Sequence, residues 1–455
     1  MPGHPVSLFP VQFRQFVDDD LGCASYLIGD ESSGEAVVVD PAYAIEQYLA
    51  EADKRHVRIT RVLETHTHAD HVSGHGRFAL EHEVPVHVHP AANAEYANES
   101  LEDGQEISLG EVRIRVVHTP GHRPEHCCFT VIDGSRGEEP WLVITGDSLL
   151  IGDAARPDLA SEAVEGATGL YGSLQRLLEL PDGVELYPGH VAGSLCGAGM
   201  SSKASSTIGF ERRFNHALNV DRDEFVLERA NSSTPRPPNM ENIVELNRGP
   251  FVAAREPLGT VDSPDGGSVL DVRRPRDFAA GHVHGAFNVP LTSSSFATKA
   301  AFVLTADEPV AIYAESPEDA ETAARGLRSV GLFNLRGYLP HADATETIEP
   351  IDIDELEKLL ANGPVEILDV REKNERDEGY IDGTRHMPYR IVRAFLEDLP
   401  DDRPIVTICS SGSRASIAAS VIASAGIEVH PVLGGGIPQW AERGGTMVQF
   451  RRCGS

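Results

Sequence analysis

Between residues 20 and 190 the chain alternates short apolar runs with turn residues. The runs have the length of β-strands and are rich in β-branched residues, so they predict strands. They span residues 25–30, 36–41, 61–66, 84–89, 112–117, 126–133 and 141–147. Two stretches between them, Ile45 to Arg55 and Gly169 to Leu180, have the pattern of helices. This mixture of elements predicts a layered α/β domain.

A second pattern occurs twice, after the turn-rich sequence NSSTPRPP at 231–238, which predicts a nearby linker. Residues 268–290 and 365–389 share an apolar strand, Asp-Val-Arg, a charged helical stretch and a Gly-x-(Val/Ile)-x-Gly element. Each copy continues with an apolar strand, at 310–314 and 404–409, and then a helix rich in small residues. A repeat of about a hundred residues indicates two copies of one α/β domain.

The repeat and the chain length together predict the number of domains. With 455 residues, the chain is three times as long as a typical domain of about 150 residues. We expect one mixed α/β domain at 1–247 and two copies of the repeat at 248–347 and 348–455.

Charge and cysteine content narrow the class of protein. Asp and Glu total 70 against 39 Lys and Arg, a formal charge of −31, which argues against nucleic acid or an anionic membrane as partner. The sequence has no signal-type leader and no run of ~18 apolar residues, so we expect a soluble, cytoplasmic protein. Six cysteines in 455 residues do not make a disulfide framework, which favours free thiols in a reducing compartment. We also expect a homo-oligomer.

Histidine is concentrated in the first domain, where thirteen of the nineteen residues fall at or before His190. The densest group, THTHADHVSG at 65–74, directly follows a predicted strand. Imidazole and carboxylate groups at this spacing can face one point, and both suit Zn(II) or Fe(II). Three further candidates close later strands. The candidate ligands are His66, His68, Asp70, His71, His118, Asp147 and His190.

This ordered set, HxHxDH followed by His, Asp and His, resembles the metallo-β-lactamase superfamily over about residues 10–245. The resemblance implies an αββα sandwich. In hydrolases of that superfamily such as glyoxalase II, the whole set binds two metal ions, here two Zn(II). In its persulfide dioxygenases, two histidines and an aspartate hold one Fe(II), and the matching positions are His66, His118 and Asp147. The residues that would then surround the iron site are His68, Asp70, His71 and His190.

The ligand set alone leaves both readings open, because every residue needed for either is present. A triad of two histidines and one carboxylate leaves positions at which O₂ and a sulfur substrate bind the same Fe(II). The sequence TGDSLLIGDAARPDL at 145–159, with Arg156 and Asp158, is similar to the version found in bacterial persulfide dioxygenases. It favours one Fe(II) per chain.

The second repeat contains a cysteine loop. The strand at 404–409 delivers Cys409 into CSSGSR at 409–414, and a helix follows. Inward-pointing backbone N–H groups, the helix dipole and Arg414 would stabilise a thiolate there. The loop resembles that of rhodanese sulfurtransferases, whose cysteine carries a sulfane sulfur, so we predict Cys409 and Arg414 as catalytic. Many rhodaneses have arginine in place of Ser410, a difference that argues against thiosulfate as donor.

The first repeat departs further from the rhodanese pattern. Its strand at 310–314 runs into ESPED at 315–319, which has no cysteine and places carboxylates where an anion would bind. We expect an inactive rhodanese-like domain that serves as a spacer or a docking surface.

The remaining cysteines carry less weight. Cys196, in the glycine-rich sequence GHVAGSLCGAG at 189–199, is a candidate persulfide carrier because it follows His190 closely. Cys127 and Cys128 are adjacent on a predicted strand, so they face opposite sides and cannot act together. No role is expected for Cys23 or Cys453. Histidines outside the motifs, among them His126, are expected to be surface or structural residues.

The combination of domains resembles the persulfide dioxygenase–rhodanese fusions of sulfide detoxification. It implies oxidation of a low-molecular-weight thiol persulfide (RSSH) with O₂ and water to sulfite and thiol. Cys409 would transfer sulfane sulfur to sulfite, giving thiosulfate. One alternative is a binuclear-zinc thioester hydrolase of glyoxalase II type fused to a sulfurtransferase. Another is a sulfane-sulfur carrier or sensor whose inactive repeat docks a partner.

Overall fold

A computed structural model describes residues 11–191, 201, 203–231, 235–341, 344–362 and 365–449. The chain divides into two compact units. The first, or N-terminal unit, is Met1–Arg255 with Ser329–Gly331, and the second, or C-terminal unit, is Glu256–Arg328 with Leu332–Ser455. Of the candidate site residues, Cys196 lies outside the described residues.

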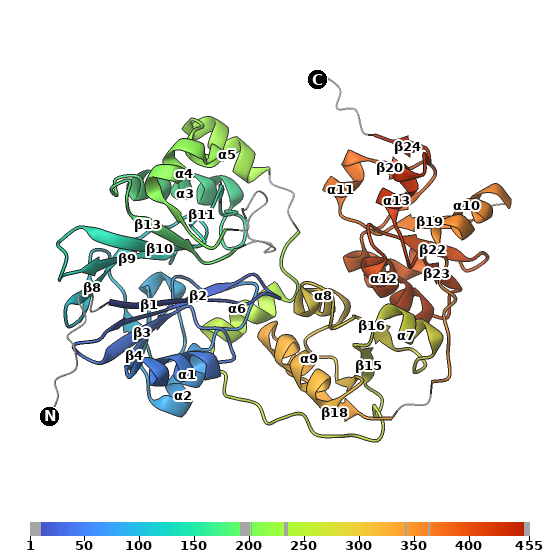
Figure 1. Ribbon diagram of the computed structural model, residues 1–455, viewed down its shortest axis with the longest axis horizontal. Helices are drawn as coiled ribbons and strands as arrows, with labels where there is room; N and C mark the ends of the chain where they lie inside the picture. Colours follow the sequence, from blue (N-terminus) through green and yellow to red (C-terminus); the bar gives the residue numbers. More distant parts are fainter. Residues whose placement is uncertain are drawn as a thin grey trace. The chain divides into compact units, whose positions relative to one another are not determined.

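Two mixed β-sheets pack face to face in the N-terminal unit (Figure 1). The first sheet consists, in spatial order, of β1 (Val11–Val17), β2 (Ala24–Asp30), β3 (Glu35–Val39), β4 (Arg58–Leu63), β5 (Val86–Val88) and β6 (Glu99–Ser100). The second consists of β14 (Ser206–Thr207), β13 (Glu185–Pro188), β10 (Pro140–Gly146), β9 (Cys127–Asp133), β8 (Val112–His118) and β7 (Glu106–Leu109). A short hairpin, β11 (Leu149–Leu150) and β12 (Asp153–Ala154), follows β10.

Helices cover the outer face of each sheet (Figure 1). The first sheet carries α1 (Glu46–Arg55) and α2 (His75–His82), and the second carries α3 (Ala163–Leu177), α4 (Ile208–Phe214) and α5 (Arg222–Ala230). The remaining helical segments are η1 (Pro90–Ala92), η2 (His216–Leu218) and α6 (Met240–Arg248). The layers therefore run helix, sheet, sheet, helix, which confirms the predicted αββα sandwich.

Alternation along the strands fills the three spaces between these layers. Tyr26 and Ile28 point into the space between the sheets, where Phe129 meets them. Leu27, between them on β2, packs instead with Tyr48 on the helix side of the first sheet. Successive residues of a strand point to opposite faces of the sheet. Because both faces are covered here, successive positions are apolar.

Two adjacent cysteines show the same alternation. Cys127 lies in the core between the sheets, whereas Cys128 packs on the helix side of the second sheet. Both side chains are fully buried, and burial raises the pKa of both thiols, that of Cys128 to about 12. The prediction that these two residues face opposite sides is confirmed.

Element boundaries differ from the sequence-based expectations at two informative places. The helix expected over 169–180 begins six residues earlier, at Ala163, and runs through Gly166. A Cβ at Gly166 would lie 2.5 Å from Pro157 O, so this glycine serves close packing rather than helix termination. The strand expected over 61–66 ends at Leu63, which leaves the histidine motif in a loop.

The C-terminal unit contains two parallel sheets with the same topology. The sheet of the first repeat has the order β16 (Phe287–Asn288), β15 (Ser268–Asp271), β17 (Val310–Tyr313), β18 (Leu335–Leu339). That of the second has the order β21 (Arg385–His386), β19 (Glu366–Asp369), β22 (Ile405–Ile408), β23 (Val429–Pro431). A small antiparallel pair, β20 (Tyr380–Ile381) and β24 (Met447–Val448), completes the strands. The shared order confirms the internal repeat.

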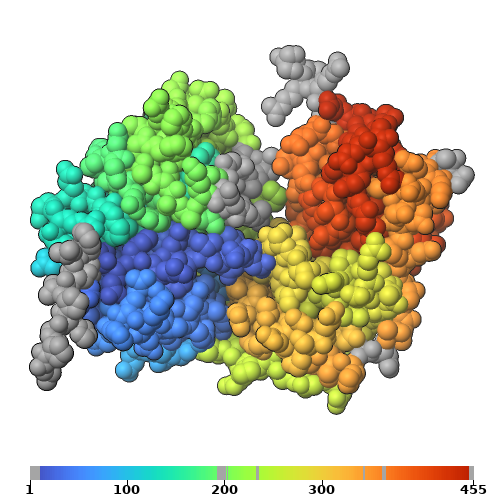
Figure 2. Space-filling model, viewed as in Figure 1, coloured from blue at the N-terminus to red at the C-terminus, as the bar shows by residue number. Residues whose placement is uncertain are grey.

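Helices flank both sheets of the C-terminal unit (Figure 1). Those of the first repeat are α7 (Pro275–Ala280), α8 (Phe296–Val303) and α9 (Pro317–Ser329). Those of the second are α10 (Ile353–Asn362), α11 (Lys373–Glu378), η3 (Tyr389–Asp398), α12 (Ser413–Ser424) and α13 (Ile437–Glu442). In the space-filling view, the yellow surface of the first repeat adjoins the orange and red surface of the second (Figure 2).

The domain boundaries expected at 247/248 and 347/348 stay predictions, since the division between compact units falls after Arg255. A search of the described helices finds none with the length and apolar character needed to cross a bilayer.

Candidate metal centre and cysteine loop

Strand ends from both sheets of the N-terminal unit meet at one edge of the sandwich. His66 lies just beyond β4, Asp147 follows β10 directly, and His190 comes shortly after β13. Glycines permit this convergence. A Cβ at Gly146, whose φ is +46°, would lie 2.7 Å from His126 Nε2, and one at Gly189 would lie 2.7 Å from Asp147 Oδ1. A side chain at either position would therefore force the loops apart.

Three buried side chains form the first potential metal-binding cluster: His66, His122 and Asp147. Asp147 Oδ2 lies 3.9 Å from His66 Nε2 and 3.6 Å from His122 Nε2. Burial raises the pKa of Asp147, but His190 and His122 outweigh it and hold the pKa well below its usual range. Its carboxylate is therefore charged, and Oδ2 has no hydrogen-bond partner among the described residues.

The far side of each imidazole is already bonded, which fixes the side that faces the cluster. His66 Nδ1 is 2.9 Å from Thr65 Oγ1, whose hydroxyl donates to Asp40 Oδ2 at 2.7 Å. His122 Nδ1 donates to the carbonyl oxygen of Arg156 at 2.9 Å. Both Nε2 atoms therefore carry lone pairs toward Asp147 Oδ2. Two imidazoles and one unpaired carboxylate oxygen fit a divalent cation such as Fe(II) or Zn(II).

His118 does not lie in this cluster. It is the last residue of β8, its ring stacks on that of His89 with centroids 4.0 Å apart, and its Nε2 donates to Pro124 O. In the sequence HTPGH at 118–122, the turn at Thr119–Gly121 directs the chain toward the cluster. The second histidine of this sequence, His122, is therefore the one that reaches Asp147. We therefore replace His118 by His122 in the candidate triad.

A second buried cluster combines Asp70, His71 and His190 with Cys23. His190 Nε2 is 2.7 Å from Asp70 Oδ2, and its Nδ1 is 2.7 Å from Asp147 Oδ1. The Cys23 thiol lies 3.3 Å from both His71 Nδ1 and His190 Nε2. The structure thus brings these three predicted residues together and joins them to the first cluster through His190.

His68 turns away from both clusters. Its Nε2 lies 3.4 Å from Asp40 Oδ1 and 3.3 Å from Glu64 Oε2. Burial by itself lowers the pKa of His68, but the two carboxylates outweigh it and raise the pKa to about 9. Asp40, Glu64 and His68 thus form a third buried cluster that could hold a metal ion, apart from Asp147.

The cysteine loop of the C-terminal unit begins where β22 ends. Cys409 is 1 % exposed, and its Sγ accepts a hydrogen bond from the Gly412 amide at 3.1 Å. Gly412 has φ +95° and caps α12, so its conformation turns that amide toward the sulfur. The strand–loop–helix arrangement expected from the sequence is present.

Arg414 of this loop bonds to acid and hydroxyl groups. Its guanidinium donates to both oxygens of Glu375 and, at 3.2 Å, to Ser410 Oγ. Burial raises the pKa of Glu375, but Arg414 outweighs it and lowers the pKa to about 2. The pair ties α11 to the beginning of α12, so Arg414 fixes the loop that holds Cys409.

The corresponding position of the first repeat is a helix cap. Ser316 Oγ accepts from the Asp319 amide at 3.1 Å and donates to the Asp319 carboxylate at 2.7 Å, directly before α9. No thiol stands between β17 and α9, as the sequence shows.

Family comparisons agree with this geometry. The model described as Metallo-beta-lactamase superfamily matches residues 18–190, and the Rhodanese-like domain model matches 255–339 and 352–443. The persulfide dioxygenase ETHE1 of Bos taurus is 30 % identical over 246 residues, which cover 54 % of this chain and 90 % of that protein. The chain belongs to the metallo-beta-lactamase superfamily.

Other relatives in this superfamily point the same way. The human persulfide dioxygenase ETHE1 is 29 % identical over 52 % of this chain and 88 % of its own length. A solved metallo-beta-lactamase from Staphylococcus aureus is 26 % identical and aligns with a TM-score of 0.67, covering 72 % of this chain and 98 % of that one. The chain is thus a fusion of a metallo-beta-lactamase domain with rhodanese-like domains.

His122, His126 and Cys23 lie at this centre but were not among the candidate site residues predicted from the sequence. His126 accepts a hydrogen bond from the Asp147 amide at 3.0 Å through Nε2, and its Nδ1 donates to Thr119 Oγ1 at 2.8 Å. Burial lowers the pKa of His126 to about 3, so it is neutral and serves as that acceptor. Cys23 belongs to the second cluster and lies directly before β2. No motif in the neighbouring sequence indicates this position.

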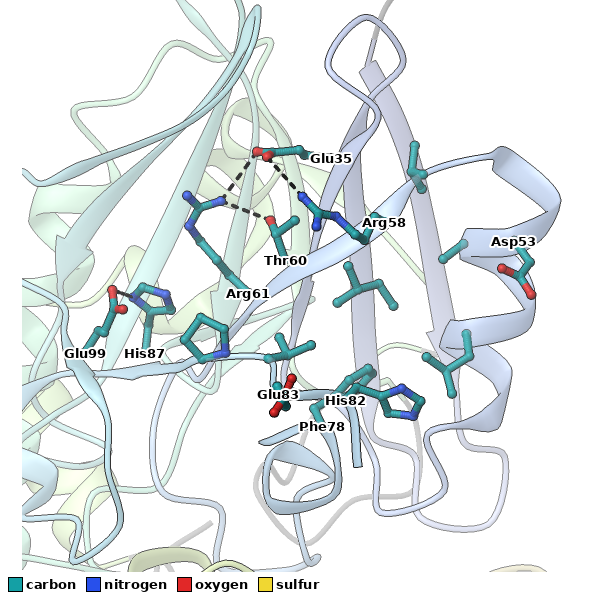
Figure 3. A pocket seen from close by; sticks show the side chains of 16 residues that line it. Glu35, Asp53, Arg58, Thr60, Arg61, Phe78, His82, Glu83, His87 and Glu99 are labelled. Atoms are coloured by element: carbon teal, nitrogen blue, oxygen red, sulfur yellow. Dashed lines mark hydrogen bonds and ion pairs between the residues drawn. The ribbon is translucent and has the colours of Figure 1, made fainter. Parts of the chain in front are cut away.

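A cavity of about 790 Å³ lies between the first sheet and helices α1 and α2 (Figure 3). It is separate from the candidate metal centre. Arg58 and Arg61 in that cavity pair with Glu35, and His87 lies 3.6 Å from Glu99. None of the residues of the described metal clusters lines it.

Proposed function

We propose that this chain is a bifunctional enzyme of sulfide detoxification. Its N-terminal unit would oxidise a low-molecular-weight thiol persulfide with O₂, and its C-terminal unit would transfer sulfane sulfur. The arrangement of His66, His122 and Asp147 is the observation that carries the proposal, because it presents two nitrogens and one oxygen to a single point. The alignment with the persulfide dioxygenase ETHE1 of Bos taurus, which covers 90 % of that protein, supports the assignment.

These three residues would hold one Fe(II), which supplies O₂ activation and a Lewis-acidic position for the persulfide sulfur. Thr65 and the carbonyl oxygen of Arg156 hold the two imidazoles by their Nδ1 atoms. Arg156 is itself fixed by a bidentate pair with Asp158, with N–O distances of 2.8 and 2.9 Å. This outer layer orients the ligands before any substrate arrives.

The overall reaction is RSSH + O₂ + H₂O giving RSH and sulfite with two protons. His190, bonded through Nδ1 to Asp147 and through Nε2 to Asp70, would hold or pass protons at this centre. At the second site, the Cys409 persulfide would donate its outer sulfur to sulfite. The S–S bond of the enzyme breaks, thiosulfate forms, and Cys409 recovers its proton.

Metal analysis and oxygen consumption test the first activity. Purified without oxygen, the chain should contain close to one equivalent of iron and consume O₂ with glutathione persulfide. His122→Ala should lose iron and lower O₂ uptake by more than about 100-fold, because it removes a ligand. His118→Ala is the matched control and should retain both.

Two outcomes would overturn this assignment. Loss of iron in His118→Ala but not in His122→Ala would return the triad to the sequence-based choice. Two zinc ions per chain without any O₂ uptake would exclude the dioxygenase.

The second candidate is a binuclear-zinc thioester hydrolase fused to a sulfurtransferase. The second cluster favours it, since Asp70, His71 and His190 could hold another ion beside Asp147. The cytoplasmic hydroxyacylglutathione hydrolase of Arabidopsis thaliana is 35 % identical over 170 residues, covering 62 % of that protein. Hydrolysis of a glutathione thioester by the zinc-loaded chain, absent from the iron-loaded one, would establish this function.

A further inference from the structure

The C-terminal unit contains a cavity of about 460 Å³ that is walled by both repeats. This volume lies in the range of small-molecule sites, ~300–1,000 Å³. The first repeat contributes Arg274, Pro275, Arg276, Asp277, Pro290, Thr292 and Ser293. The second contributes Ser411, Gly412, Ser413, Leu433 and Gly434.

One end of the cavity is the loop that holds Cys409. Ser411, Gly412 and Ser413 line it, and the Gly412 amide is the group that bonds Cys409 Sγ at 3.1 Å. Ser413 Oγ lies 3.3 Å from Ser293 Oγ of the first repeat. A molecule in this cavity would therefore lie against the loop at which sulfur is exchanged.

Two arginines of the first repeat, Arg274 and Arg276, also line the cavity. Arg276 reaches across so that its Nη2 lies 3.5 Å from Leu433 O. Gly434, with φ +95°, leaves room for it, because a Cβ there would stand 3.0 Å from the same nitrogen. Arg274 lies two residues before Arg276 and is exposed. Against these two cations, Asp277 supplies the single carboxyl group of the described lining.

Close to these arginines, hydrogen bonds join the first repeat to α12, the helix that follows Cys409. The Asn288 amide donates to the carbonyl oxygens of Asp271 and Arg273, both at 3.0 Å. Its Oδ1 accepts from Ser416 Oγ of α12 at 3.0 Å, and its backbone N–H donates to Ser420 Oγ at 2.9 Å. Asn288 is fully buried. The segment that leads into Arg274 is therefore held in register with the helix that begins at the cysteine loop.

The charge of the wall indicates the ligand. The whole chain carries −31, so an anion approaches this loop favourably only where local cations offset that field. Guanidinium groups bind carboxylates with paired, charge-assisted hydrogen bonds. The cavity is also larger than sulfite alone would need.

We propose that Arg274 and Arg276 of the inactive repeat bind the carboxylates of the sulfur donor, an anionic low-molecular-weight thiol persulfide, and thereby determine its selection by Cys409. This rests on the proposed sulfurtransferase function. The Cys409 thiolate attacks the outer sulfur of RSSH, the donor S–S bond breaks, and RS⁻ leaves and takes a proton. A new S–S bond forms on Cys409, and no external oxidant is consumed.

Steady-state kinetics of the full chain under anaerobic conditions test this, because the dioxygenase reaction then cannot consume the donor. Thiosulfate formation is followed with sulfite as acceptor and either glutathione persulfide or cysteamine persulfide, which has no carboxylate, as donor. The double variant Arg274→Gln/Arg276→Gln should raise KM for glutathione persulfide about tenfold or more, the factor that ~1.4 kcal/mol of binding gives. Its kcat and its KM for cysteamine persulfide should stay unchanged.

Two further variants sharpen the test. Asp277→Asn should lower KM for glutathione persulfide, since it removes the opposing charge. Arg336→Gln, at an exposed arginine of β18 outside the cavity, is the matched control and should change nothing.

An equal loss with both donors, or an effect confined to the KM for sulfite, would overturn the donor site. Unchanged kinetics in the double variant would overturn it as well. Cys409→Ser separates this inference from the proposed function: if that variant still forms thiosulfate, the sulfurtransferase assignment itself fails.

Discussion

Individual side chains at the metal centre are oriented by bonds on the side that faces away from the cation. Thr65 is the clearest case, because one hydroxyl serves both Asp40 and His66. The donor must go to Asp40, since a carboxylate only accepts, and this leaves the oxygen to accept from His66 Nδ1. A single hydroxyl therefore selects the tautomer of a predicted ligand.

Thr65→Val tests this role at nearly constant volume. The variant should weaken iron binding about 10–100-fold, because the outer bond that orients His66 is lost. It should also lower the free energy of unfolding by about 1–3 kcal/mol, since Asp40 and His66 are buried and lose a partner. Competition with a chelator measures the first effect and thermal denaturation the second.

Thr130→Val is the control for this substitution. Thr130 is a buried threonine of β9 whose hydroxyl bonds Arg115 O at 3.4 Å, away from the metal centre. It should lose stability without changing iron affinity. Unchanged iron affinity in Thr65→Val would show that His66 is held by its packing alone.

The residue scale also shows where prediction from the sequence ends. The spacing of HxHxDH brought His66 and Asp70 together at the end of a predicted strand, but that strand was expected to reach His66 and ends at Leu63. Choosing between His118 and His122 needed the path of the turn between them, where Gly121 closes against Leu170. Cys23 and Asp40 precede the motif by dozens of residues, so only the tertiary fold brings them to the centre.

At the scale of elements, an ion pair joins the short helix α11 to its neighbour α12. Glu375, in α11, binds Arg414, in α12, and the pair sets the beginning of the helix that follows Cys409. The pKa of Glu375 is lowered from 4.5 to about 2. Its contribution to stability is therefore complete above pH 4.5 and lost as the pH falls toward 2.

Glu375→Gln should consequently lower the melting temperature more at pH 7 than at about pH 2.5, where most of this contribution has been lost. The linked free energy is about 1–3 kcal/mol once solvent screening of a partly exposed pair is included. The matched control is Asp377→Asn, which breaks an exposed pair with Lys373 on the same helix and should matter little at either pH. Equal losses at both pH values in Glu375→Gln would contradict the ionic origin of the effect.

Elements of the repeat were easier to predict than those of the first domain. Strands β17 and β22 are almost entirely buried parallel strands, so continuous apolar runs mark them clearly. Helix α3 begins before its predicted start, and it includes Gly166, which lies close to Pro157 O. The local sequence indicates which conformations a segment prefers. It does not show which distant residue packs so closely that only glycine fits.

At the scale of the whole molecule, the two proposed activities reside in separate compact units. Each candidate site is built from residues of one unit, so each should work when the other is disabled. Removing iron with a chelator should abolish O₂ uptake while thiosulfate formation from glutathione persulfide and sulfite continues. Cys409→Ser should do the reverse, and oxygen electrode and thiosulfate assays on the same preparations would show it.

Loss of both activities after chelation alone would contradict this independence. It would mean that the metal centre is required for the C-terminal unit to fold or to act.

The position of the metal centre also has a mechanical consequence. His66 follows a strand of the first sheet, whereas His122 and Asp147 follow strands of the second. A cation held by all three would act as a crosslink between the two halves of the sandwich. A ligand that binds only the native state stabilises it roughly in proportion to the logarithm of the ligand concentration. The melting temperature of the N-terminal unit should therefore rise with the concentration of free iron.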